Sequence, residues 1–114
     1  MALIEYCPGF AEKLRRDFPR VHVHRIDAAR LQQLELFNGE RAGAVISGIP
    51  LLLMSAHSVT GLLEAAFAKL RSDGAFYQFT YGRDAPIAGR VLDRIGLEAT
   101  RIGGALANLP PAHV

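Results

Sequence analysis

Cysteine, lysine and tryptophan are scarce in this sequence, which holds one cysteine, two lysines and no tryptophan. With Cys7 alone, the chain can form neither an internal disulfide nor a cysteine-rich zinc site. The longest apolar run, at 49–54, contains Pro50 and is far too short to cross a bilayer. The first residues lack the basic stretch and apolar segment of a signal peptide. These absences predict a soluble protein of the reducing cytoplasm with no transmembrane segment.

The composition that remains is that of a globular domain. Of the 114 residues, 50% are hydrophobic and 21% are charged, and the net charge is +2. Basic and acidic residues are spread almost evenly between 1–41 and 42–114, so neither part forms a basic arm that would attract a phosphate backbone. We therefore expect a single domain over residues 1–114, and nucleic acid is a poor candidate partner.

The hydrophobic pattern alternates between strand and helix along the chain. Strands are expected at 2–6, 21–26, 42–47, 75–81 and 98–102, and helices after Pro8-Gly9, after Asp27, at 58–71 and at 87–95. Gly74 and Gly96 are expected to end the last two helices, Gly74 in the left-handed conformation. Strands separated by helices of about ten residues favour parallel pairing through right-handed crossovers, so the predicted class is α/β.

Three of these segments carry more detailed expectations. The strict alternation of 21–26 predicts a half-exposed strand near a sheet edge. The aromatic side chains of 75–81 are expected mostly in the core. The Asn108-Leu109-Pro110-Pro111 stretch is expected to end regular structure.

Polar residues lie where three of the expected strands end: Glu5, Asp27 and Ser47. Ligands of open parallel sheets bind outside the carboxyl ends of the strands, and a carboxylate there can accept hydrogen bonds from ribose hydroxyls or an adenine amino group. Each residue also has a structural interpretation. Asp27 can cap the following helix, Glu5 can lie near a helix N-terminus, and Ser47 can stabilise a turn. The sequence leaves both interpretations open.

Two further features bear on chemistry but favour no site. His22 and His24 share one face of a strand, which would suit a metal pair, yet no third ligand is suggested and surface histidines are the preferred interpretation. Cys7 immediately precedes a helix N-terminus, a place where reactive thiols occur, but no histidine partner accompanies it. We expect neither a metal centre nor a catalytic thiol.

The ordered segments of the chain resemble a known family. These segments are LIEYCPGFAEKLRRDFP, VHVHRIDAARL, AVISGIPLLLM, FYQFTYG and NLPPAHV. Together they are similar to class I S-adenosylmethionine-dependent methyltransferases, and within these to the bacterial phospholipid N-methyltransferases, which are often labelled rRNA adenine dimethylase-like. The likeness covers nearly the whole chain. It implies a Rossmann-like sheet of about five mainly parallel strands alternating with helices.

The resemblance also implies a cofactor, a methyl acceptor and roles for individual residues. S-adenosylmethionine would be the cofactor and the amine of a phosphatidylethanolamine head group the acceptor, with no metal. Glu5 would bind the ribose hydroxyls and Asp27 the adenine. The implied cofactor contacts are Glu5, Tyr6, Asp27, Ala28, Ser47 and Gly48, and the implied substrate contacts are Pro50, Leu51 and Tyr81.

The chain departs from the family pattern at both ends. It begins where the family's second strand would begin, it contains no G-x-G loop, and it ends before the family's final strand. We therefore expect a domain truncated at both ends, without the first strand and glycine-rich loop, that forms a homodimer over the exposed edge or apolar surface. The alternative is a non-catalytic α/β domain acting as an oligomeric or binding module. Methylation of nucleic acid is disfavoured because the stretch from Ser47 to Leu51 has no aromatic residue to stack on a flipped base.

Overall fold

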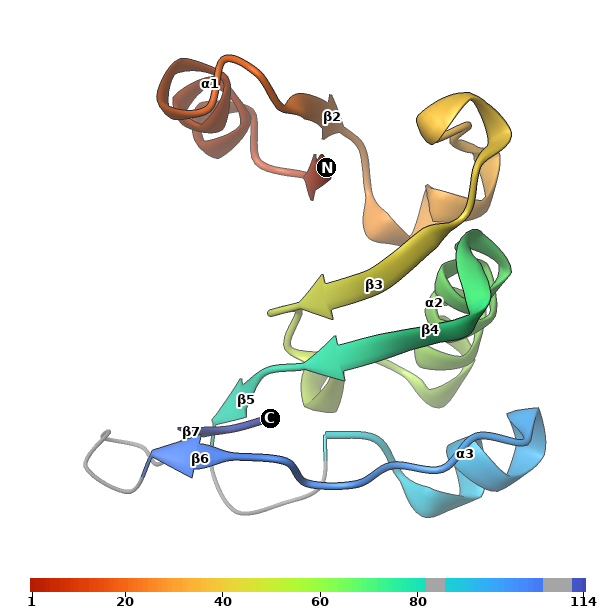
Figure 1. Cartoon of the computed structure of the whole chain (residues 1–114). Helices are drawn as coiled ribbons and strands as arrows, with labels where there is room; N and C mark the ends of the chain where they lie inside the picture. Colours follow the sequence, from red (N-terminus) through yellow and green to blue (C-terminus); the bar gives the residue numbers. More distant parts are fainter. Residues whose placement is uncertain (82–85, 106–111) are drawn as a thin grey trace. The chain divides into compact units, whose positions relative to one another are not determined.

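The computed structural model of the chain, which describes residues 1–81, 86–105 and 112–114, has an α/β architecture (Figure 1). The chain divides into two compact units, Met1–Glu40 and Arg41–Val114, called unit 1 and unit 2 below. Within the described ranges, no helix combines the length and the apolar character needed to cross a membrane. The interpretation of the chain as a single domain stays a prediction.

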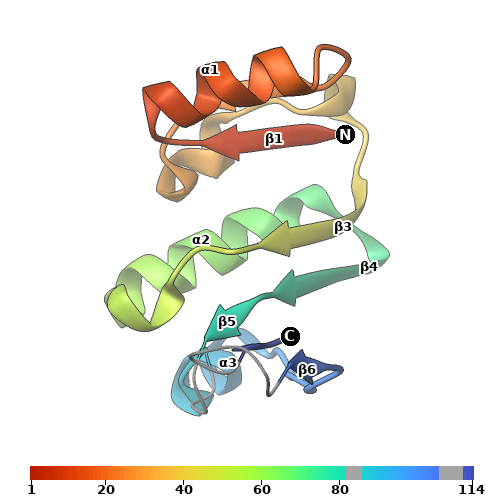
Figure 2. The ribbon, with the colours of Figure 1, turned by 90° about the vertical axis from the view of Figure 1, so that its left-hand side faces the viewer.

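Unit 1 is a β-α-β arrangement followed by short 3-10 helices. Its elements are β1 (Ala2–Glu5), α1 (Pro8–Asp17), β2 (His22–Arg25) and the 3-10 helices Ala28–Gln33 and Phe37–Gly39. The two strands pair in parallel, with Leu3 opposite Val23, and α1 lies along β1 (Figure 2). The parallel pairing and the edge position of β2 agree with the sequence prediction, because β2 pairs with β1 alone among the described strands.

The bounds of α1 follow from two prolines. Pro8 occupies the first turn, where its missing N–H leaves no bond unmade, and the helix ends shortly before Pro19. The apolar stripe of this helix is only partly covered: Ala11 is fully buried, whereas the side chain of Phe10 is 63% exposed. Unit 1 therefore has a small core.

Unit 2 contains the longer helix and strands of the chain. Its elements are β3 (Ala42–Ser47), a 3-10 helix (Leu51–Leu53), α2 (Ala56–Lys69), β4 (Leu70–Gln78), β5 (Thr80–Tyr81), α3 (Gly89–Ile95), β6 (Gly104–Ala105) and β7 (Ala112–His113). Strands β3 and β4 pair in parallel. The short strands β5, β7 and β6 form an antiparallel sheet in that order.

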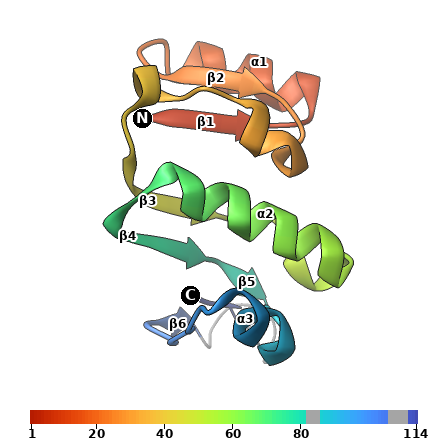
Figure 3. The same cartoon turned by 90° about the vertical axis from the view of Figure 1, so that its right-hand side faces the viewer.

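The core of unit 2 lies between α2 and one face of the β3–β4 pair (Figure 3). Leu62 and Leu63 of α2 are buried, and the ring of Phe67 stacks on Phe76 of β4 with 6.2 Å between the ring centroids. Successive side chains of a strand alternate between faces. Ile46 therefore lies on the face opposite α2, and it is 83% exposed.

The predicted end of the longest helix is wrong. Helix α2 ends at Lys69, and Leu70 begins β4 directly, so Gly74 lies within a strand and is not a left-handed helix end. Glycine at this position allows backbone carbonyl groups to come close to its Cα atom. A Cβ at Gly74 would lie 3.0 Å from the carbonyl oxygens of Arg71 and Gly43. Gly96, in contrast, has φ 68° and ends α3 in the left-handed conformation as predicted.

The aromatic strand and the last predicted strand also differ from expectation. The 75–81 segment is divided at Phe79 between β4 and β5, and the side chains of Tyr77, Phe79 and Tyr81 are exposed, not in the core. Residues 98–102 form no strand; pairing begins at β6 instead. The predicted end of regular structure at 108–111 lies outside the described residues. Antiparallel pairing of the last strands replaces the expected parallel pairing there.

Candidate functional site

Unit 1 brings Glu5 and Asp27 to the same edge of its sheet. Glu5 is the last residue of β1 and lies opposite Arg25, the last residue of β2. The carbonyl oxygen of Glu5 accepts a hydrogen bond from Ile26 N, at 3.2 Å, so the pairing continues up to the residue before Asp27. Because the strands are parallel, both carboxylates follow carboxyl ends of adjacent strands, which is the edge where ligands of such sheets bind.

The Glu5 carboxylate stabilises the start of α1. Its Oε1 atom accepts a hydrogen bond from the backbone N–H of Cys7, the N-cap residue of that helix, at 2.7 Å. This contact orders the β1–α1 turn, and negative charge is favourable beside a helix N-terminus. The Glu5 side chain is partly exposed. The structural interpretation of Glu5 is thus realised, and it fixes the direction of the carboxylate.

Asp27 caps the 3-10 helix that follows β2. Its Oδ1 atom accepts a hydrogen bond from Ala29 N at 2.9 Å, which confirms the predicted capping role. The carboxylate is exposed, and Ala28 beside it is half-buried. Tyr6 follows Glu5 with an exposed side chain. The four unit 1 residues implied as cofactor contacts therefore gather at one edge of the β1–β2 pair.

In unit 2, the Ser47 segment ends β3 as predicted. Ser47 is buried and lies opposite Gln78 of β4, and its Oγ atom accepts a hydrogen bond from Ile49 N at 3.3 Å, which is turn chemistry. Gly48 and Pro50 are exposed. Leu51 is only 3% exposed, so in this arrangement its side chain belongs to the core.

Tyr81 ends β5 with an accessible ring. Its side chain is 54% exposed, and the ring meets Phe79 edge to face with 5.0 Å between centroids. An exposed aromatic face of this kind can attract an alkylammonium group. The structure thus leaves Tyr81 available to a ligand.

The remaining sequence candidates are His22, His24 and Cys7. His22 and His24 lie on β2 opposite Ala2 and Ile4. Within the described ranges, no three histidine, cysteine, aspartate or glutamate side chains come together as a metal site would need. Cys7 is exposed and unpaired with another cysteine.

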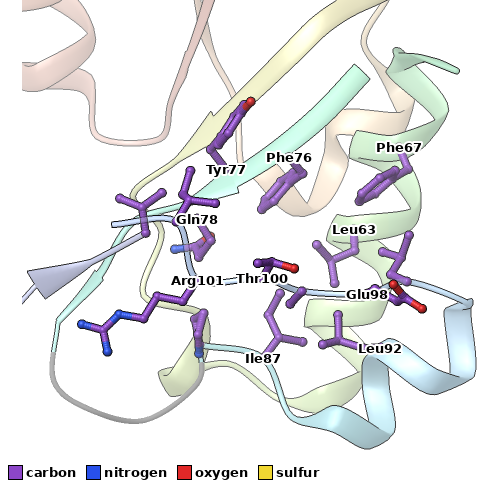
Figure 4. A pocket seen from close by; sticks show the side chains of 15 residues that line it. Leu63, Phe67, Phe76, Tyr77, Gln78, Ile87, Leu92, Glu98, Thr100 and Arg101 are labelled. Carbon is purple, nitrogen blue, oxygen red and sulfur yellow. The ribbon is translucent and has the colours of Figure 1, made fainter. Parts of the chain in front are cut away.

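Sequence reasoning missed a cavity in unit 2 of about 390 Å³ (Figure 4). Its walls come from α2, β4, the α3 region and the segment leading to β6. Gln78 lines it, and the buried Oε1 atom of this residue has no hydrogen-bond partner in the described structure. The signal in the sequence was the single amide within the aromatic stretch at 75–81.

Comparison with protein-family models finds no match, and comparison with curated proteins and with solved structures finds no significant one.

Proposed function

We propose that the chain is a methyltransferase-like protein that uses S-adenosylmethionine, of the phospholipid N-methyltransferase type, and that unit 1 binds the nucleoside part of this cofactor. The observation that carries the proposal is the pair of carboxylates, Glu5 and Asp27, at the carboxyl edge of two adjacent parallel strands. The ordered sequence motifs support the same family. The proposal includes a mainly parallel, Rossmann-like sheet as the fold.

Both carboxylates keep capacity to accept further hydrogen bonds. Glu5 and Asp27 each receive one backbone N–H on one oxygen atom, whereas an ionised carboxylate offers about four acceptor positions. Adjacent ribose hydroxyls match the acceptor-only character of Glu5, and an exocyclic adenine amino group matches that of Asp27. The backbone bonds hold the two groups in place before a ligand arrives, which lowers the entropic cost of binding.

When bound, S-adenosylmethionine would supply an electrophilic methyl group: an amine nitrogen would form the new N–C bond as the S–C bond breaks, S-adenosylhomocysteine would leave, and the amine proton would go to water. The contribution of the chain would be positioning, which can account for a large part of the rate of such a reaction. Glu5 and Asp27 would orient the nucleoside. Tyr81 would hold the amine head group through its exposed ring, with phosphatidylethanolamine as the acceptor. Ser47 and Gly48 would line the methyl-transfer site.

Calorimetric titration with S-adenosylhomocysteine tests the cofactor half of the proposal. We expect micromolar binding to the wild-type chain and at least tenfold weaker binding to Asp27→Ala. Asp27→Asn keeps an oxygen that can accept from Ala29 N and removes only the charge. A loss of affinity in this variant therefore reflects the ligand contact and not the loss of the helix cap. Glu12→Gln, at an exposed acid of α1, is the control and should bind as the wild type does. No heat at millimolar ligand would reject the proposal.

A second measurement tests the acceptor. Purified chain is incubated with methyl-labelled S-adenosylmethionine and vesicles containing phosphatidylethanolamine, and labelled lipid is quantified. We expect labelled mono-methylated lipid from the wild type and less than a tenth of it from Glu5→Ala. If the chain binds S-adenosylhomocysteine but labels no lipid, the proposed cofactor stands and phosphatidylethanolamine is rejected as the acceptor.

The alternative function is that of a non-catalytic α/β module that associates with a second copy of itself. The observation that favours it is the apolar face of the β3–β4 pair opposite α2, where Ile46 lies beside Tyr77 in register. Parallel sheets are normally covered on both faces. Sedimentation should then give a dimer that Ile46→Lys dissociates, whereas Ala68→Lys on the exposed side of α2 should not. A monomeric wild type at high concentration would reject this module.

A further inference from the structure

Leu52 and Leu53 form an exposed apolar tip on unit 2. Their side chains are 50% and 86% exposed, and both lie in the 3-10 helix between β3 and α2. We propose that this Leu52–Leu53 tip docks the chain on a phospholipid bilayer without net charge by inserting into its head-group region. The choice of a bilayer as the partner rests on the proposed function, in which the methyl acceptor is a lipid.

The exposure of the two leucines is set by the residues around them. Leu51 is 3% exposed and belongs to the core of unit 2, and the two residues after it turn outward. The N–H of Leu53 donates to the carbonyl oxygen of Pro50 at 3.0 Å, which closes the turn. Ser55 then caps α2. The tip is therefore held between a buried residue and a capped helix.

The backbone of the tip is suited to an apolar environment. A backbone N–H that enters a bilayer without a partner is costly. Here Pro50 has no N–H, and those of Leu51, Leu53 and Met54 donate to carbonyl oxygens of residues 49–51 at 2.8–3.1 Å. Insertion of the tip would leave these bonds in place.

The charge of the surrounding segment favours a bilayer without net charge. Residues 42–63 contain no aspartate, glutamate, lysine or arginine. No charged side chain of this segment would therefore have to leave water with the tip, which would be expensive. Docking on anionic lipids typically uses clusters of lysine and arginine, and this segment has none.

The size of the tip favours a bilayer over a protein partner. A stable protein interface takes roughly 20–30 residues from each side, whereas the tip offers two strongly exposed leucines. A bilayer requires no matching surface, because each apolar side chain that enters it contributes by the apolar area it buries. We therefore expect weak, reversible docking.

The tip and Tyr81 lie beyond the same edge of unit 2, the carboxyl end of the β3–β4 pair (Figure 2). Phe79 N donates to Ser47 O, and Gln78 Nε2 donates to Ile49 O, both at 2.8 Å. These bonds join the chain before the tip to the strand end that leads into β5. The exposed ring of Tyr81 is of the kind found at membrane–water interfaces. A bilayer at this edge would bring lipid head groups to the residue proposed to hold the amine.

A fluorescent side chain at the tip tests the docking. The sequence has no tryptophan, so a single introduced indole reports only on its own surroundings. Leu53→Trp places it at the tip, and Ala68→Trp, on the exposed side of α2, is the matched control. Each full-length variant is titrated with phosphatidylcholine vesicles, whose fully methylated head group accepts no methyl. We expect a shift to shorter wavelength and quenching by brominated acyl chains in Leu53→Trp alone.

A second substitution tests the apolar contact itself. Leu52→Asp, added to Leu53→Trp, should weaken vesicle binding about tenfold, because an aspartate at this position resists insertion. Ala68→Asp in the same background should leave binding unchanged. All these positions are exposed, and circular dichroism checks that each variant is folded.

Three outcomes would overturn the docking tip. These are no shift at millimolar lipid, equal shifts in Leu53→Trp and Ala68→Trp, and binding that Leu52→Asp leaves unchanged. The methylation assay separates this inference from the proposed function. If the chain docks on phosphatidylcholine but labels no phosphatidylethanolamine, the docking tip stands and the acceptor is rejected. If lipid is labelled although the indole shows no shift, the acceptor stands and the docking tip is rejected.

Discussion

Gly74 is the residue at which the absence of a side chain sets the path of β4. A Cβ atom there would lie 3.0 Å from each of two carbonyl oxygens, those of Arg71 and Gly43, and 3.1 Å from Leu70 Cδ2. The register between β3 and β4 shifts in this stretch, from Ala42 opposite Leu70 to Ala44 opposite Ala75. The two carbonyl oxygens cannot move away from position 74 without disturbing the pairing of β3 with β4. A residue without Cβ is therefore required.

We expect Gly74→Ala to lower the free energy of unfolding by about 1–3 kcal/mol, the usual cost of forcing an extra carbon into a packed place. The matched control is Gly61→Ala, within α2, where a Cβ would meet nothing within 4 Å. That change should raise the free energy of unfolding by about 1 kcal/mol, because alanine favours a helix interior over glycine. Urea unfolding measures both. Equal effects of the two substitutions would contradict the close-approach explanation.

The Arg71–Asp73 pair gives a pH dependence of known sign. Hydrogen bonds from the Arg71 guanidinium, together with its charge, hold the pKa of the Asp73 carboxyl below its usual value. A carboxyl with a lowered folded-state pKa adds stability above its unfolded pKa and loses it as the pH falls through the folded pKa. Both side chains are exposed, so the contribution is small. Carboxyl NMR titration should show the pKa of Asp73 returning toward its usual value in Arg71→Gln; an unchanged midpoint would reject the pairing.

At single positions, sequence reasoning succeeded where the interaction is local. The Asp27 cap needs only a backbone N–H two residues away, and the Glu5 contact also spans two residues. The prediction for Gly74 was wrong, because a glycine is equally typical of a helix end and of a place where another part of the backbone comes close. Sequence reasoning missed Gln78, because the partners of its amide nitrogen include Ile49, which lies far away in the sequence.

Helix α2 owes its start to Ser55. The Oγ atom of Ser55 accepts a hydrogen bond from Ser58 N at 3.1 Å, which satisfies one backbone N–H in the first turn. We expect Ser55→Ala to lower the free energy of unfolding by about 1 kcal/mol, and Ser55→Asp to restore it, because an aspartate keeps the capping oxygen and adds a favourable charge. Thermal unfolding followed by circular dichroism measures both. Equal losses in the two variants would show that Ser55 does not act as the cap.

The accuracy of the predicted elements depends on where their partners lie. Strands β1 and β3 were predicted well, because each is a short apolar run bounded by a proline or glycine signal. The strand expected at 98–102 does not form, since β propensity alone does not provide a pairing partner. Ile102 N donates to Val114 O and Val114 N donates to Gly103 O, both at 3.0 Å, and the strand pairing itself begins with Gly104 opposite His113. The last residues of the chain carry no strand pattern that would have revealed this.

In the whole chain, the local order of strands and helices predicted the parallel pairs but not the antiparallel sheet of unit 2. Parallel pairing of β1 with β2 and of β3 with β4 follows from a helix between the strands. The antiparallel order β5-β7-β6 pairs β5 with β7, which lies far from it in the sequence, and no periodicity of the sequence indicates this pairing. The carboxylate pair of unit 1 could be predicted because it follows from parallel pairing of adjacent strands. The cavity of unit 2 could not, because its lining comes from α2, β4 and residues 86–102, which are separate in the sequence.

Burial is unequal between the two units. The buried apolar residues of unit 1 are Ala11 and Leu31, whereas α2 of unit 2 alone contributes Val59, Leu62, Leu63, Ala65 and Ala66. The free energy of opening a segment depends on the apolar surface that the opening exposes. Unit 1 should therefore open without the rest of the chain.

We expect this difference to appear in amide hydrogen exchange of the full chain. Amides of α1, in unit 1, should exchange more than about ten times faster than those of α2, because opening unit 1 exposes little apolar surface. Adding S-adenosylhomocysteine should slow exchange in unit 1 and leave that of α2 unchanged if Glu5 and Asp27 bind it, since a ligand stabilises only the state to which it binds. The amides of α2 serve as the internal control. Equal protection of α1 and α2 without ligand would mean that unit 1 is held by contacts beyond its own core, as a second copy of the chain would provide.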